Sequence, residues 1–80
     1  MYLRLPDPDG GAGQWITEHD RTGRRLRQIE VTPNGRSVAT TDQDWPMNPP
    51  FDLGDPTFVS HEITSDEFEE VWQRATGMAG

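Results

Sequence analysis

The residues best suited to acid–base chemistry in this sequence are its two histidines, His19 and His61. With the arginines Arg24, Arg25 and Arg27 they would supply a general acid, a general base and a cationic clamp, as in a metal-free ribonuclease. This hypothesis requires both imidazoles to converge with the arginines in one pocket. It predicts a small phosphate-ligand-binding or nuclease-like protein, but the net charge of −7 opposes an anionic substrate.

Metal-dependent and nucleophilic chemistry have weaker support. Cysteine is absent, which excludes thiolate zinc sites and cysteine nucleophiles. The two histidines lack metal-ligand spacing, and no serine lies in the Gly-x-Ser-x-Gly context of a nucleophile elbow. The glycines of segment 6–13 (PDPDGGAG) are not followed by the Gly-Lys-Ser/Thr of a phosphate loop. We therefore predict no catalytic residues, no metal ligands and no cofactor.

Charge is distributed unevenly along the chain. Residues 1–41 hold six arginines and five acidic residues, a net charge of +1, whereas residues 42–80 hold one arginine and nine acidic residues, a net charge of −8. Nucleic acid binding needs clustered positive charge, so this asymmetry argues against a nucleic acid partner and favours a basic protein. The alternative interpretation is a solubilising surface whose carboxylates pair with the arginines of the first half.

The candidate partner-binding residues are the acidic side chains of the second half and one tryptophan that would anchor an interface. They are Asp42, Asp44, Trp45, Asp52, Asp55, Asp66, Glu67, Glu69 and Glu70. We expect the carboxylates near the C-terminus to face outward and to form one acidic surface with those of residues 42–55. Trp15 and Trp45 suit a core position as well as an interface.

The best-defined element in the sequence is a helix over residues 64–76. Thr64 and Glu67 have the spacing of a capping box, and Gly77 stands where a left-handed C-cap belongs. Spacing of i, i+3, i+4 and i+7 gives the helix one apolar stripe, formed by Phe68, Val71, Trp72 and Ala75. The stripe must pack on a sheet, because so short a helix is marginal alone. We expect Trp72→Ala to be the most destabilising single substitution.

Alternating apolar and polar side chains predict strands at residues 2–5, 14–20, 24–31 and 36–41. Turn sequences at 20–23 (DRTG) and 32–35 (TPNG) join the last three strands into a meander. The length of 80 residues predicts one domain, residues 1–80. The predicted fold class is therefore α+β, with an antiparallel three- to five-stranded meander sheet and one C-terminal helix packed on one face.

Three stretches depart from this regular pattern. Leu26 is out of phase with Ile29, which predicts either a β-bulge near residues 27–28 or a sheet covered on both faces. Segment 6–13 predicts a flexible loop. Segment 42–57 predicts a long ordered loop, and residues 58–63 a strand or an extended approach to the helix. The loop is expected to pin itself through Trp45, Met47, Phe51 and Leu53.

No apolar run is long enough to span a membrane, and the first ten residues lack the apolar core of a signal peptide. We therefore expect a soluble, cytoplasmic protein with no membrane partner.

Three motifs resemble a family of small, uncharacterised bacterial single-domain proteins, largely from actinobacteria. They are the initial YLR, the hairpin TGRRLRQIEVTPNGR and the closing segment FDLGDPTFVSHEITSDEFEEVWQRA. The family carries no established activity, and proteins of this size and type are often immunity partners of toxins. The resemblance and the charge together predict a non-enzymatic protein-interaction domain, an acidic immunity- or antitoxin-like inhibitor of a basic toxin domain. The other hypotheses are the phosphate-binding or nuclease-like protein above and an accessory domain of unknown role.

Overall fold

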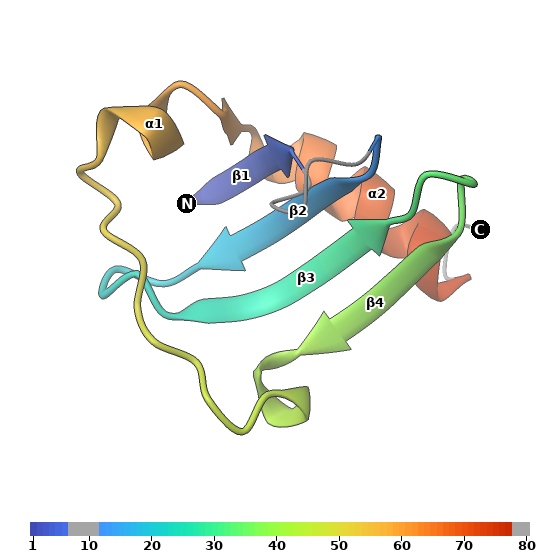
Figure 1. Cartoon of the computed structure of the whole chain (residues 1–80), viewed down its shortest axis with the longest axis horizontal. Helices are drawn as coiled ribbons and strands as arrows, with labels where there is room; N and C mark the ends of the chain where they lie inside the picture. The colour runs from blue at the N-terminus through green and yellow to red at the C-terminus, as the bar shows by residue number, and fades with distance from the viewer. Residues whose placement is uncertain (7–11, 78–80) are drawn as a thin grey trace.

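The computed structural model describes residues 1–6 and 12–77, which form a five-stranded antiparallel sheet and a closing helix (Figure 1). The strands are β1 (Tyr2–Pro6), β2 (Gln14–His19), β3 (Arg25–Val31), β4 (Ser37–Thr41) and β5 (Glu62–Ile63). The helical elements are the 3₁₀ turn η1 (Asp42–Asp44), the short α1 (Pro56–Val59) and α2 (Ser65–Thr76). The predicted α+β class, an antiparallel sheet with a C-terminal helix, is confirmed.

The strand order is β4-β3-β2-β1-β5, so β5 returns after the meander to pair with β1 at the far edge. Both predicted turns form. The N–H of Gly23 donates to the carbonyl of Asp20 at 3.1 Å, and that of Gly35 donates to the carbonyl of Thr32 at 2.9 Å. Both glycines have positive φ, a conformation that strains other residues. The turn residues therefore determine how three of the strands are joined.

The pairing of β2 with β3 is irregular at one point. Glu18 faces Arg27, but His19 faces Arg25, so Leu26 is an extra residue on β3. The irregularity lies just before its predicted position at residues 27–28. The sheet is also covered on both faces, so both explanations for the phase of Leu26 hold.

α2 packs on the sheet face that carries Ile16 and Ile29. These two residues and Phe68 are fully buried and form one apolar cluster, against which Val71, Trp72 and Ala75 are partly buried. The predicted stripe is thus confirmed, as are the capping box at the start of the helix and its left-handed C-cap glycine. Phe68 rather than Trp72 occupies the centre of the core, so the largest loss of stability is now expected at Phe68.

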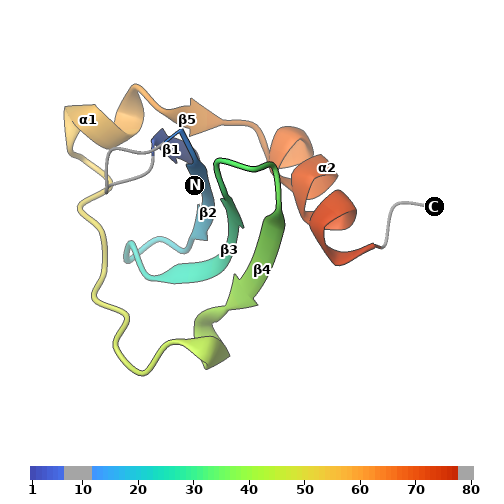
Figure 2. The ribbon, with the colours of Figure 1, turned by 45° about the vertical axis from the view of Figure 1, so that its right-hand side comes forward.

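The segment from η1 to α1 crosses the other face, and Figure 2 shows it and α2 on opposite sides of the sheet. The guanidinium of Arg25 lies 4.0 Å from the centre of the Trp45 ring. The Asn48 side-chain amide donates to the Arg25 carbonyl at 2.8 Å, and the Phe51 N–H donates to the Gly23 carbonyl at 2.8 Å. These contacts make the segment the ordered cover that its apolar residues predicted. Met47 is no part of it, because its side chain is 81 % exposed.

The end of this segment differs from the sequence prediction. Residues Pro56–Val59 form a helical turn, because Asp55 accepts the Thr57 N–H at 2.9 Å and proline occupies the first turn. Only Glu62–Ile63 join the sheet, so a strand over 58–63 is wrong for its first half. Of the predicted loop 6–13, residues 7–11 lie outside the described residues. No helix among the described residues has the length and apolarity to cross a membrane.

Candidate functional site

The acidic residues of segment 42–55 serve the chain's own turns. Asp42 forms an ion pair with Arg24 at 3.2 Å. Asp44 and Asp52 each accept a backbone N–H of their own turn, at 2.8 and 3.0 Å, and Asp55 caps α1. The Arg24–Asp42 pair ties the segment to the sheet, as the alternative interpretation of the charges predicted. These carboxylates therefore stabilise the chain's own turns and its contact with the sheet.

The acidic residues of α2 have separate surroundings. Glu67 completes the capping box, and Glu70 forms an i, i+4 ion pair within the helix. Glu69 points back to the sheet, where it meets Arg27, so the expectation that it faces outward is wrong. The Asp66 side chain has no hydrogen bond or ion pair with the rest of the described chain. Because segment 42–55 and α2 lie on opposite sides of the sheet, the single acidic surface expected from the sequence is divided in two (Figure 2).

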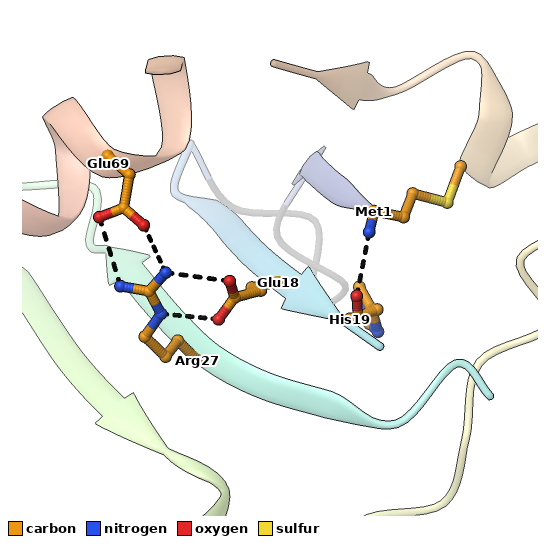
Figure 3. Close-up of polar contacts among 5 residues, drawn as sticks. All are labelled: Met1, Glu18, His19, Arg27 and Glu69. Atoms are coloured by element: carbon orange, nitrogen blue, oxygen red, sulfur yellow. Dashed lines mark hydrogen bonds and ion pairs between the residues drawn. The ribbon is translucent and has the colours of Figure 1, made fainter. Parts of the chain in front are cut away.

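Arg27 joins the sheet to α2 (Figure 3). Its Nε donates to Glu18 at 2.6 Å, and its Nη2 donates to Glu69 at 2.5 Å. The guanidinium also lies 4.8 Å from the Phe68 ring centre and 5.0 Å from that of Trp72. Hydrogen bonding to Glu18 raises the pKa of Arg27, and the same bond holds the pKa of Glu18 below its ordinary value. Arg27 therefore links β2 to α2 through its carboxylate partners and is not available as a phosphate clamp.

His19 is enclosed by the fold. Its side chain is 3 % exposed, and its ring centre lies 4.5 Å from that of Phe51. Nδ1 donates to the Gly23 carbonyl at 3.1 Å, and Nε2 accepts from the Thr17 hydroxyl at 2.8 Å. Burial lowers the pKa of His19 and favours the neutral ring. With both nitrogens occupied, the imidazole has no free position for a substrate.

His61 lies elsewhere. Its carbonyl accepts the Arg4 N–H at 2.9 Å, on the β5 side of β1, whereas His19 exchanges backbone hydrogen bonds with Met1 on the β2 side (Figure 3). The structure therefore does not bring the histidines and the arginine stripe into one pocket. Within residues 1–6 and 12–77, no three His, Cys, Asp or Glu side chains are grouped to hold a metal ion.

The structure instead forms an open groove where β1, β5 and the start of α2 meet. Its volume is about 690 Å³, and its lining residues are Met1, Tyr2, Val59, Glu62, Ile63, Thr64, Ser65 and Glu67. Tyr2, Ile63 and Val59 supply apolar surface, and Val59 is 51 % exposed. Glu62 and Glu67 supply carboxylates. No arginine is among the described residues that line the groove.

The floor of the groove is continuous with the core. The Tyr2 ring centre lies 5.1 Å from that of Phe68, which fixes the tyrosine against the buried cluster. Burial, with the nearby Glu18 carboxylate, raises the pKa of the Tyr2 hydroxyl and keeps it protonated. Glu67 caps α2, so a carboxylate of the chain itself already occupies the positive end of the helix dipole. The lining of the groove thus combines a tyrosine fixed against the core with two acidic residues, Glu62 and Glu67.

Of the residues that line the groove, Glu67 is a predicted partner-binding residue and Glu62 belongs to the same acidic half of the sequence, whereas the roles of Tyr2 and Val59 were not predicted. The pairing of β5 with β1 brings these residues together, and a two-residue strand leaves no alternation to recognise. The one local signal was the Asp-Pro start of α1, an N-cap followed by proline.

No protein-family model, curated protein or solved structure matches the chain. The function is therefore inferred from the geometry and charge of the site.

Proposed function

We propose that the chain is a non-enzymatic protein-interaction domain that binds a basic segment of another protein in the groove between β1, β5 and α2. The observation that carries the proposal is that one groove is lined both by the apolar residues Tyr2, Val59 and Ile63 and by the acidic residues Glu62 and Glu67. An arginine or lysine side chain suits this surface. Its aliphatic stem packs on Tyr2 and Ile63, and its charged head meets the carboxylates.

The charges around the groove support a basic partner. Among the described residues, the carboxylates of Glu62 and Asp66 have no ion pair, in contrast to Asp42 and Glu69. Their charge is therefore available to a partner. The net charge of −7 adds long-range attraction, which increases association rates for basic proteins.

Inhibition of a basic toxin domain is the specific form of this proposal that the sequence motifs favour. An inhibitor of this kind needs charge complementarity to a cationic cleft and no catalytic groups of its own. The groove supplies the first. The nuclease-like alternative loses support, because His19 is enclosed and Arg27 is paired internally.

Affinity capture from the native host, with mass spectrometry at low and high salt, tests the proposal. We expect a basic protein that is retained at low salt and released at high salt. With that protein, Glu62→Lys and Asp66→Lys should each lower the association rate constant by about tenfold. Glu30→Lys, on β3, changes the net charge equally away from the groove and should have a much smaller effect.

Thermal melts would verify that the three variants remain folded. Equal association rates for wild type, Glu62→Lys in the groove, Asp66→Lys beside it and the β3 control would contradict the proposed site. A captured partner without excess positive charge would contradict the proposed chemistry.

A further inference from the structure

Residues 45–51 (WPMNPPF), here named the proline segment, expose apolar side chains that the fold does not use. Pro46, Pro49 and Pro50 are exposed, and the side chain of Met47 is 81 % exposed. A proline ring fixes its own φ at about −65° and restricts the residue before it to extended backbone. Three prolines in seven residues therefore specify an extended path for most of the segment.

Burial along the proline segment repeats every three residues. Trp45, Asn48 and Phe51 are partly buried, whereas the two residues between each pair are exposed. Trp45 stacks on Arg25, and the Asn48 amide donates to the Arg25 carbonyl. The Phe51 N–H donates to the Gly23 carbonyl. Three residues per turn is the period of a polyproline II helix, so one of its three rows of side chains faces the sheet.

The backbone of the segment is open, as in a polyproline II helix, which has no internal hydrogen bonds. Among the described residues, no backbone group of residues 46–50 takes part in a backbone–backbone hydrogen bond. Trp45, which precedes the first proline, is extended, with φ −112° and ψ 116°. Figure 1 shows the segment as an extended connection between η1 and α1.

The other two rows of side chains face solvent. Pro46 and Pro49 form one row, with the spacing of a P-x-x-P motif, and Met47 and Pro50 form the other. Aromatic-lined grooves bind such rows by packing proline rings between aromatic side chains. Because the row that faces the sheet is already held and the prolines limit backbone freedom, binding would cost little conformational entropy.

Both ends of the proline segment are acidic. Asp44 precedes it and Asp52 follows it, and both are exposed. Each accepts a backbone N–H of its own turn, but neither forms an ion pair within the described chain. Their negative charges therefore favour a groove with a basic rim.

We propose that the proline segment is a second interaction site, a preformed polyproline II ligand for an aromatic-lined groove with a basic rim on another protein. Pro46 and Pro49 enter the groove, and Met47 packs along its edge. The site is separate from the groove between β1, β5 and α2, because none of the described residues that line that groove belongs to the proline segment.

Photocrosslinking of the full chain tests the proposal. Met47 is replaced by the photoreactive amino acid p-benzoylphenylalanine, and the chain is irradiated in an extract of the native host. Mass spectrometry then identifies the crosslinked peptide. We expect a crosslink to a surface groove lined by tyrosine, tryptophan or phenylalanine. Adding Pro46→Ala and Pro49→Ala together should lower its yield at least about tenfold, because both the rings and the fixed backbone are lost.

Two variants serve as matched controls, and thermal melts verify that all variants remain folded. Pro56→Ala removes an exposed proline from the start of α1, outside the proline segment. Glu62→Lys alters the other groove. Both should keep the crosslink yield within about twofold. The proposal is overturned if the double proline variant crosslinks as well as its parent, or if the crosslinked surface has no aromatic groove. It is also overturned if Glu62→Lys lowers the yield as much as the double proline variant, because the two sites would then be one.

Discussion

The two faces of the sheet are covered by different kinds of contact. On the α2 face, Ile16, Ile29 and Phe68 are at most 1 % exposed and form a continuous apolar cluster. On the other face, no residue of segment 42–59 is fully buried. That segment contacts the sheet at a few points, chiefly where Trp45 stacks on Arg25 and where the Phe51 N–H donates to the Gly23 carbonyl. One face is a hydrophobic core, whereas the other is a pinned cover.

Polar groups without partners distinguish the pinned face further. Trp15 Nε1, Arg25 Nε and Asn48 Oδ1 are buried and lack a hydrogen bond within the described chain. Each such group costs about 1–3 kcal/mol when unsatisfied. Burial also lowers the pKa of Arg25, because the charged guanidinium is partly desolvated. The cover should therefore open more readily than α2, and the predictions below test this difference.

The largest effect is expected at the centre of the core. Phe68→Ala should lower the free energy of unfolding by about 3–5 kcal/mol, because it leaves a cavity beside Ile16 and Ile29. Phe51→Ala, on the pinned face, should cost about 1–3 kcal/mol, because Phe51 is only partly buried. Urea denaturation measures both changes. Equal losses in the free energy of unfolding would show that the two faces contribute alike to stability.

Gly23→Ala should release the cover. A Cβ at Gly23 would lie 2.0 Å from the Phe51 carbonyl oxygen, and the glycine has a φ of +87°. The Gly23 carbonyl also receives the Phe51 N–H and His19 Nδ1, so all of these contacts would shift. We expect a loss of about 2–4 kcal/mol. Hydrogen exchange should show faster exchange in segment 42–59 than in α2.

Gly35→Ala separates backbone strain from the steric overlap. Gly35 has nearly the same φ, +85°, but a Cβ there meets no atom within 4 Å. Its cost should be limited to strain, about 1–2 kcal/mol. If the two glycine variants lose the same stability, the Gly23–Phe51 contact does not hold the cover.

The ion pairs of the two faces should also differ in strength. Arg27→Met retains apolar contact with the Phe68 and Trp72 rings but leaves Glu18 without its partner. We expect a loss of about 1–3 kcal/mol. Arg24→Met breaks the more exposed pair with Asp42 and should cost at most about 1 kcal/mol. A larger loss for Arg24→Met would reverse the ranking of the faces.

The elements with strong local patterns were predictable from the sequence. The capping residues Thr64 and Glu67 and the apolar stripe predicted α2. Gly23 and Gly35 predicted the two turns. In each case the residues that specify the element are its own neighbours in sequence, so no tertiary information is needed.

The groove and the division of the acidic surface were not predictable, because both depend on pairing between distant parts of the chain. A two-residue β5 has no periodicity, yet its pairing with β1 creates the groove. Prolines suggested an irregular path through residue 57, which hid the helical turn that Asp55 begins. Glu69 was expected to face solvent because it is charged, whereas its side chain points to the sheet and forms an ion pair with Arg27.

Acid should open the two faces in separate pH ranges. His19, on the pinned face, has a folded-state pKa below its ordinary value of 6.5, so the unfolded chain binds this proton first. Its contribution to stability is complete above about pH 6.5 and is lost as the pH falls below that value. Glu18, on the α2 face, has a pKa below its ordinary 4.5 and loses its contribution only below that lower value.

Urea denaturation between pH 7.5 and 3 should therefore show two successive losses of stability as the pH falls. His19→Gln should remove the upper step. Glu18→Gln should reduce the lower one, to which Asp20 also contributes because its hydrogen bond from Thr22 lowers its pKa. His61→Gln, outside these contacts, should retain the two steps. Exchange of segment 42–59 should accelerate in the upper step, before that of α2, because His19 contacts Phe51. Simultaneous acceleration of both segments would show that core and cover unfold as one unit.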